Sequence, residues 1–288
     1  MKLGVFTVLL SAKSLEESLA YLKESGVQAV ELGTGGYPGK AHVNPDELLG
    51  DSSAISRLKE LVKKYDMEIS ALSCHGNPIH PQKEIASRFQ EDFEKTILLA
   101  EKLGIERVCG FSGCPGDSPN SLYPNWVTCP WPDDFLQILD YQWNEVLIPY
   151  WQKMARFAQD HGVNKICFEM HPGFAVYNPE SLLKLRNAVG DIIGANFDPS
   201  HLFWQGIEDV KHYSDEINRS WIFRTVGYGH DYQVWKDIVS TLRMIGYDYV
   251  LSIEHEDSLM SVNEGLQKAV KFLKEVLAFE NTGEMWWA

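Results

Sequence analysis

Hydrophobic and polar positions follow two alternating patterns along the chain, and the change from one pattern to the other repeats. Stretches with helical spacing end in glycine or a polar pair and pass directly into short apolar runs, as in "ESGVQAVELG", "KLGIERVCGFSG" and "DHGVNKICFEMH". Glycine is the usual residue just after a helix, and a continuous apolar run is typical of a buried parallel strand. The pattern therefore predicts repeated helix-to-strand units.

Seven such strands are predicted, with starts near residues 3, 27, 67, 105, 164, 192 and 248. The helices predicted between or after them are Leu15–Ser25, Ile55–Tyr65, Arg88–Leu103, Pro179–Val189 and Val262–Leu277. Strands that alternate with helices form a parallel sheet, and a chain of 288 residues has an ordinary length for a closed (β/α)8 barrel. We therefore expect one α/β TIM barrel domain over residues 1–288, with a doubly wound open sheet as the alternative.

Composition narrows the class of protein. The formal net charge of −14 disfavours binding to nucleic acid or to an anionic membrane, because both need a basic surface. The five cysteines show no CxxC spacing, which indicates a reduced chain in the cytoplasm. The apolar run near the N-terminus is soon interrupted by Glu16 and Glu17 and has no signal-peptide cleavage pattern, so it predicts no membrane span.

Three of the predicted strands end in a carboxylate where a barrel should be closing its core. Side chains alternate along a strand, so Glu169 shares a face with Cys167 and points away from the large apolar residues beside it. The same alternation turns Asp198 and Glu254 inward, and His75 ends the third strand. Active sites of such barrels lie at the carboxyl ends of the strands, so we expect these polar side chains to converge at one mouth.

A cluster of this kind needs a compensating charge. Carboxylates gathered in a buried site cannot all stay ionised without a partner, and a divalent metal is the simplest partner. Each carboxylate could instead cap a helix or form a salt bridge in a loop, and His75 could be a structural histidine. His171 and His255 fit a supporting or structural role better than a role as ligands.

Several motifs together resemble those of the xylose-isomerase-like TIM barrels, which include sugar phosphate isomerases and epimerases. The motifs are "ALSCHGNPIHP", "FEMHPGFAVYNPE", "NFDPSHLFWQG", "RTVGYGHD" and "SIEHEDSLM", and the resemblance covers essentially the whole chain. It implies a TIM barrel in which strands five to eight hold Mn²⁺, Mg²⁺, Co²⁺ or Zn²⁺. It further implies Glu169, Asp198 and Glu254 as metal ligands, His201 as a residue that binds metal or substrate, and His75 in the sugar site.

The sequence departs from that family pattern between Asp198 and Val250. Relatives have a seventh strand with a His-x-His motif there, followed by a long loop, and this segment is absent. A barrel without the strand would keep an open edge with unpaired backbone groups. Residues 221–226, rich in β-branched and aromatic side chains, are predicted to replace it. The carboxyl end of this irregular or replaced seventh strand would bring His230 to the barrel mouth as a substitute metal ligand.

One long insertion follows the fourth predicted strand. It covers Cys114–Asn144, is rich in proline, tryptophan and tyrosine, and is expected to form a lid or wall over the barrel mouth. Its aromatic residues Tyr123, Trp126 and Trp131, with Phe111 just before it, could give a sugar an apolar face. They could equally form a small core of the insertion itself.

The function implied is that of a metal-dependent isomerase or epimerase of a sugar, a sugar phosphate or an inositol derivative. A metal acidifies the C–H group next to the carbonyl that it polarises, and Glu169 and Glu254 would remove and return the proton. His75 and His201 would bind the substrate. An oxygen-rich site favours Mn²⁺ or Mg²⁺ over Co²⁺ or Zn²⁺.

Two other functions stay open. A barrel that has lost one of the family's ligands could bind a sugar without turning it over. Phosphodiester cleavage of the endonuclease IV type would need many more histidine ligands and a DNA-binding face, and the acidic net charge argues against it. The expected partner is a small sugar or polyol, with neither nucleic acid nor membrane as a partner and with a homo-oligomer left open.

Overall fold

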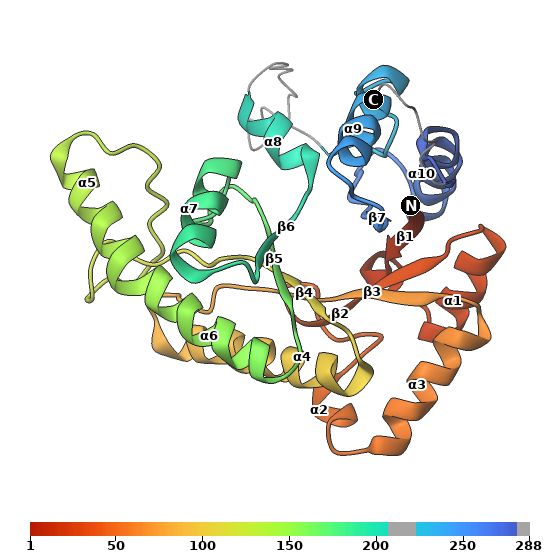
Figure 1. Cartoon of the computed structure of the whole chain (residues 1–288), viewed down its shortest axis with the longest axis horizontal. Coiled ribbons are helices and arrows are strands. Elements are labelled where there is room, and N and C mark those ends of the chain that lie inside the picture. The colour runs from red at the N-terminus through yellow and green to blue at the C-terminus, as the bar shows by residue number, and fades with distance from the viewer. Residues whose placement is uncertain (207–222, 281–288) are drawn as a thin grey trace, which may run out of the picture. The chain divides into compact units, whose positions relative to one another are not determined.

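The computed structural model describes residues 1–206 and 223–280, and Figure 1 shows the elements that they form. The strands are β1 (Lys2–Phe6), β2 (Ala29–Gly36), β3 (Glu68–His75), β4 (Arg107–Gly110), β5 (Lys165–Glu169), β6 (Ile193–Asn196) and β7 (Val250–Ile253). The α-helices are α1 (Leu15–Glu24), α2 (Pro45–Leu48), α3 (Ser52–Lys64), α4 (Lys83–Leu103), α5 (Asp133–Asp140), α6 (Ile148–Asp160), α7 (Pro179–Val189), α8 (Pro199–Gly206), α9 (Tyr232–Met244) and α10 (Val262–Val276). None of these helices is long and apolar enough to cross a membrane.

Local sequence signals fix where the helices begin and end. α1 starts at a capping box, in which the Ser14 hydroxyl accepts the Glu17 N–H and the Glu17 carboxylate accepts the Ser14 N–H. α7 starts in the same way at Asn178, with Pro179 as its first residue. α4 ends at Gly104, whose φ of 76° lies in the left-handed region that glycine adopts without strain. The glycine-to-strand transition read from the sequence at this point is therefore a helix end.

The strands follow one another in the sheet in the order β6-β5-β4-β3-β2-β1-β7. β1 pairs in parallel with β2 and β7, and β5 pairs in parallel with β4 and β6. A doubly wound sheet reverses direction part-way through its strand order, whereas this order follows the chain and places the last strand beside the first. The prediction of a barrel-type α/β fold is confirmed, and the doubly wound alternative is wrong.

All seven strands and all five helices predicted above are present, although α3 and α4 begin earlier than predicted. The prediction of a further strand over 221–226 is wrong for the part that the structure describes. Residues 223–225 are not in a strand, residue 226 lies in a turn, and 221–222 lie outside the described residues.

A side chain takes the place of the predicted strand pairing. The N–H and the hydroxyl of Thr225 both donate to Oδ2 of Asp257, at 2.7 and 2.9 Å. Asp257 follows β7 and its side chain is fully buried. A buried backbone donor needs a partner but does not need a strand as that partner. High β propensity in this segment therefore did not produce a strand.

The chain forms two compact units, each built from separate stretches of sequence. Unit 1 contains Met1–Glu31, Glu60–Ser70 and the described residues 223–280, and unit 2 contains Leu32–Lys59 and the described residues from 71 to 206. In unit 1, α10 contacts β1 and β7 through an apolar stripe with helical spacing. The buried residues of that stripe are Leu266, Ala269, Val270, Leu273 and Val276.

Unit 2 has much of its core around Trp151 on α6. The Trp151 side chain is fully buried, and its ring meets Phe93 and Phe168 in edge-to-face contacts with centroid distances of 5.5 and 4.5 Å. Its indole N–H donates to the Ser112 carbonyl at 2.9 Å. A buried tryptophan needs such a partner for its one polar group. The core contact therefore also fixes the backbone that follows β4.

Two buried amides hold the start of the insertion. Asn77, just after β3, donates to the Cys114 carbonyl at 2.8 Å and accepts the Cys114 N–H at 3.0 Å. Gln142 donates to the carbonyls of Gly116 and Asn125, at 3.0 and 2.7 Å. Gln142 lies in a π-helical turn, Tyr141–Leu147, through which α5 continues into α6 (Figure 1). The insertion thus begins beside the residues that follow His75.

Candidate functional site

Glu169, the last residue of β5, is buried with 5% of its surface exposed. Three side chains donate to its carboxylate. Oε1 lies 2.9 Å from His201 Nε2, while Oε2 lies 3.1 Å from His75 Nε2 and 3.2 Å from Asn196 Nδ2. His75 ends β3, and Asn196 is in register with Glu169 in the parallel β5–β6 pair. Within unit 2, the ends of β3 and β5 and the first turn of α8 therefore bring Glu169 together with two of the predicted site histidines.

The surroundings of Glu169 keep its carboxylate ionised. Burial by itself would raise the pKa, because a charged group loses hydration. Hydrogen bonds from His201 and His75 outweigh burial and hold the pKa of Glu169 below its ordinary value. At neutral pH this group is therefore an anion that can bind a cation or accept a proton.

Asp198 follows β6 and uses its two oxygens differently. Oδ1 accepts the Ser200 N–H at 2.7 Å and so caps the start of α8. Oδ2 lies 3.4 Å from His201 Nε2, and His201 is buried in the first turn of α8. The helix-capping alternative considered above is thus correct for one oxygen of Asp198, and the other oxygen faces the cluster.

Glu169, Asp198 and His201 each offer one ligand atom, and these atoms lie within 4.8 Å of one another. Two carboxylate oxygens and one imidazole nitrogen suit divalent cations such as Mn²⁺ or Zn²⁺. Two carboxylates this close also need a positive partner. The donor set therefore fits a divalent metal, and it includes His201 in the place of an imidazole ligand.

Aromatic rings lie beside this cluster. Phe111, which follows β4, meets His75 edge to face with centroids 4.6 Å apart and stacks on Phe174 at 4.2 Å. The His171 ring lies 4.1 Å from that of His201 and 4.9 Å from that of Phe111. Burial and the neighbouring His201 lower the pKa of His171, so its neutral form is favoured. An apolar wall of this kind can contact the C–H groups of a sugar.

The aromatic residues of the insertion are arranged differently. Trp126 meets Tyr177 edge to face at 5.4 Å, whereas Tyr123 and Trp131 are 73% and 75% exposed. Trp126 therefore contacts the segment that follows β5, and the other two rings face solvent. The prediction that these side chains contact a sugar stays a prediction.

Sequence reasoning did not identify Asn196 or Phe174 as site residues. Asn196 has the same inward parity as Asp198, so strand alternation could have identified it. Phe174 lies in the irregular segment after β5, where no periodicity applies, and only its stacking on Phe111 shows its place.

Two predicted site residues belong to unit 1. Glu254 directly follows β7 and is exposed, on the same side of the chain as the exposed Ser252. His230 directly precedes Asp231, whose side chain caps α9 by accepting the N–H groups of Gln233 and Val234. The roles of Glu254 as base and ligand and of His230 as ligand remain predictions.

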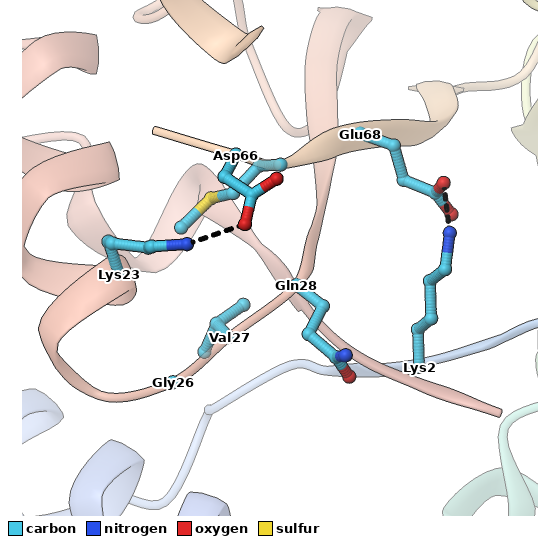
Figure 2. A pocket seen from close by; sticks show the side chains of 8 residues that line it. Lys2, Lys23, Gly26, Val27, Gln28, Asp66 and Glu68 are labelled. Carbon is cyan, nitrogen blue, oxygen red and sulfur yellow. Dashed lines mark hydrogen bonds and ion pairs between the residues drawn. The ribbon is translucent and has the colours of Figure 1, made fainter. Parts of the chain in front are cut away.

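A depression in unit 1 lies at the amino ends of β1, β2 and β3. Figure 2 shows that its charged side chains are paired, with Lys2 beside Glu68 and Lys23 beside Asp66, the latter at 3.0 Å. Barrel enzymes place their chemistry at the carboxyl ends of the strands. This depression is therefore not a candidate active site.

Comparison with known families gives a match over most of the chain. The model of the xylose isomerase-like TIM barrel family matches residues 19–276. The uncharacterized protein YfiH of Bacillus subtilis (strain 168) is 35% identical over 313 aligned positions, which cover 96% of this chain and 100% of the relative. This alignment is longer than the chain itself, which has 288 residues, so the relative has residues without a counterpart here. Such a difference is in line with the missing segment inferred from the sequence.

Similar solved structures share the fold at low sequence identity. The IOLI protein with a bound zinc atom has a TM-score of 0.65 and 18% identity, with 96% of this chain and 98% of that chain covered. A D-tagatose 3-epimerase-like protein has a TM-score of 0.60 and 23% identity, and a D-psicose 3-epimerase has 0.61 and 14%, each with the same coverage of 96% and 98%. The family match and the 35% identity to YfiH show that this chain belongs to the xylose isomerase-like TIM barrel family.

Proposed function

We propose that this protein is a metal-dependent sugar isomerase or epimerase in which carboxylates move a proton. The observation that carries the proposal is the buried Glu169 beside Asp198 and His201, with ligand atoms within 4.8 Å of one another. Two of the similar structures, a D-tagatose 3-epimerase-like protein and a D-psicose 3-epimerase, support a ketose as the substrate.

The residues divide into those that hold the cation and those that contact the substrate. Glu169, Asp198 and His201 would hold the cation, with Glu254 and His230 as the further ligands expected from the sequence. A bound divalent cation supplies Lewis-acid polarisation of the substrate carbonyl and its neighbouring hydroxyl. Oxygen-rich donors favour Mn²⁺ or Mg²⁺.

The proton moves between a substrate carbon and a carboxylate oxygen. Glu254 is proposed to take the proton, since an exposed carboxylate can accept it, and Glu169, itself an anion, to pass a proton from water back to the substrate. Return on the opposite face of the same carbon gives an epimer, whereas return to the neighbouring carbon gives an isomer. His75 would bind the substrate next to Glu169, and the rings of Phe111 and Phe174 would contact its C–H groups.

Hydrogen exchange tests this proposal directly. The protein is stripped with a chelator, reloaded with Mn²⁺, Mg²⁺, Co²⁺ or Zn²⁺, and incubated in deuterated water with D-tagatose, D-psicose, D-fructose, a ketose phosphate and an inositol-derived ketone. We expect metal-dependent deuterium incorporation at one carbon and appearance of the epimer or isomer by NMR. Binding of a sugar without exchange would instead support a barrel that binds and does not turn over. Exchange that persists after chelation would contradict the metal requirement.

A further inference from the structure

The two oxygens of Glu169 have different surroundings. Oε1 lies 2.9 Å from Nε2 of His201, and the same nitrogen lies 3.4 Å from Oδ2 of Asp198. Oε2 lies 3.1 Å from Nε2 of His75 and 3.2 Å from Nδ2 of Asn196. The donor on Oε1 is therefore His201, itself a candidate ligand that a cation would replace as the partner of this oxygen, whereas both donors on Oε2 lie outside the ligand group of Glu169, Asp198 and His201.

Of the two donors on Oε2, Asn196 has the more constant role. An asparagine amide nitrogen can only donate, whereas an imidazole nitrogen can donate or accept according to its tautomer. Asn196 also comes from the strand directly beside Glu169, because the two residues are in register in the β5–β6 pair. Its amide is thus fixed by the sheet next to the oxygen that it contacts.

We infer that Asn196 is a positioning residue that makes Glu169 a one-oxygen metal ligand. By holding Oε2, the Asn196 amide presents Oε1 to a cation shared with Asp198 and His201. This inference rests on the proposed function, because it requires that the cluster binds a metal. Residues that orient a ligand in this way change metal affinity by about 10- to 100-fold when they are removed.

A structural role of Asn196 would have a different signature. Asn196 is the last residue of the four-residue strand β6, and a change there could weaken the strand without touching the metal. Such a change would lower the melting temperature of the metal-free protein and leave the metal dissociation constant unaltered. A positioning role predicts the reverse, a weaker metal complex in a protein that is still folded.

The test compares the metal affinity of the native protein with that of Asn196→Leu, which has nearly the same size and no donor. Titration calorimetry with Mn²⁺ should show a dissociation constant about 10- to 100-fold higher for the variant. The absorption bands of bound Co²⁺ should change as well, because the second oxygen of Glu169 becomes free to join the metal. Ala195→Ser, on the exposed opposite face of β6, is the matched control and should keep the native affinity.

A second variant protects the test against misfolding. Asn196→Ser is smaller, and its hydroxyl is too short to replace the amide, so it should also weaken Mn²⁺ binding. Native affinity and an unchanged Co²⁺ spectrum in either folded variant would overturn the inference and leave the proposed function standing. Absence of Mn²⁺ and Co²⁺ binding by the native protein would instead refute the metal-dependent function and the inference with it.

Discussion

Glu169 and Glu254 come from strand ends with the same predicted inward parity, but their surroundings differ. Glu169 is buried, and three side chains donate to its carboxylate. Glu254 is exposed, directly after β7. Strand parity thus predicts the direction of a side chain and leaves its environment open. A carboxylate held on both oxygens suits a fixed ligand, whereas an exposed carboxylate suits a base that must reach a substrate proton.

The segment after β7 contains a second contrast. Three residues beyond the exposed Glu254, the Asp257 carboxylate is buried and accepts N–H groups of Thr225 and Leu259, at 2.7 and 2.8 Å. Arg224 Nε lies 3.5 Å from the same carboxylate. Asp257 therefore ties two segments of unit 1 together, and its role is structural.

The largest effect is expected from Glu169→Gln, which tests the buried side of the comparison. The amide is neutral and would present a donor to the cluster, so both metal binding and proton transfer should be lost. We expect the rate of metal-dependent deuterium exchange to fall by at least about two orders of magnitude. Calorimetry should show weakened Mn²⁺ binding in the same protein. Native turnover in this variant would show that Glu169 is not catalytic.

Glu254→Gln tests the exposed side. If Glu254 is the base, exchange should again fall by about two orders of magnitude. Mn²⁺ affinity should fall less than in Glu169→Gln, since Glu169, Asp198 and His201 remain in place. Equal losses of metal affinity in the two variants would mean that Glu254 is as important a ligand as Glu169, and the comparison would fail.

Asp257→Asn should affect stability more than chemistry. The amide cannot accept all the hydrogen bonds that the carboxylate accepts, so donors in unit 1 would lose their partner. We expect a loss of about 1–3 kcal/mol in the free energy of unfolding, measured by chemical denaturation. The exposed Ser258→Ala, one residue away, serves as the control and should be neutral. An equally stable Asp257→Asn would show that these hydrogen bonds are dispensable.

The same carboxylate gives a pH dependence with a defined sign. Burial would raise the pKa of Asp257, but hydrogen bonds from Thr225 and Leu259 outweigh it and lower the pKa. The unfolded chain, with an aspartate pKa of about 3.9, therefore takes up this proton at a higher pH than the folded protein. The stability that Asp257 contributes is therefore complete above the pKa of the unfolded chain. It is lost as the pH falls from there through the lower pKa of the folded protein. The stability difference between native protein and Asp257→Asn should shrink on acidification below about pH 4.

The smallest effect is expected from Thr225→Val, which removes one donor to Asp257 and keeps the backbone N–H. The loss should be about 1 kcal/mol by the same denaturation measurement. A larger loss than that of Asp257→Asn would mean that Thr225 acts through contacts other than this carboxylate.

Much of the fold follows from signals that lie close together in the sequence. The Ser14–Glu17 capping box and Gly104 mark helix ends, and apolar runs mark each of the seven strands. The error at 221–226 has a physical cause: β-branched residues favour extended backbone, but the partner of Thr225 is a side chain 32 residues further along. Local propensity carries no information about such a partner.

Two residues of the buried cluster were predictable from equally local signals. Alternation along β5 and β6 identifies Glu169 and Asp198 because the period of a strand is fixed. The contact between Glu169 and Asn196 depends on the register of β5 and β6, which places the two residues opposite each other. The sequence of one strand alone does not reveal its register with another. The place of Phe174 depends on an irregular segment. The residues that orient the cluster were therefore harder to predict than the residues that form it.

The strand order also governs how the chain can fold during synthesis. β1 ends at Phe6, yet one of its two neighbours in the sheet is β7, which begins at Val250. One edge of β1 therefore stays unpaired until β7 has left the ribosome, whereas β4, β5 and β6 can pair as they emerge. A nascent chain would assemble Glu169, Asp198 and His201 well before Glu254 is translated. Ribosomal stalling before β7 would then leave an intermediate with this cluster in place and an aggregation-prone strand edge.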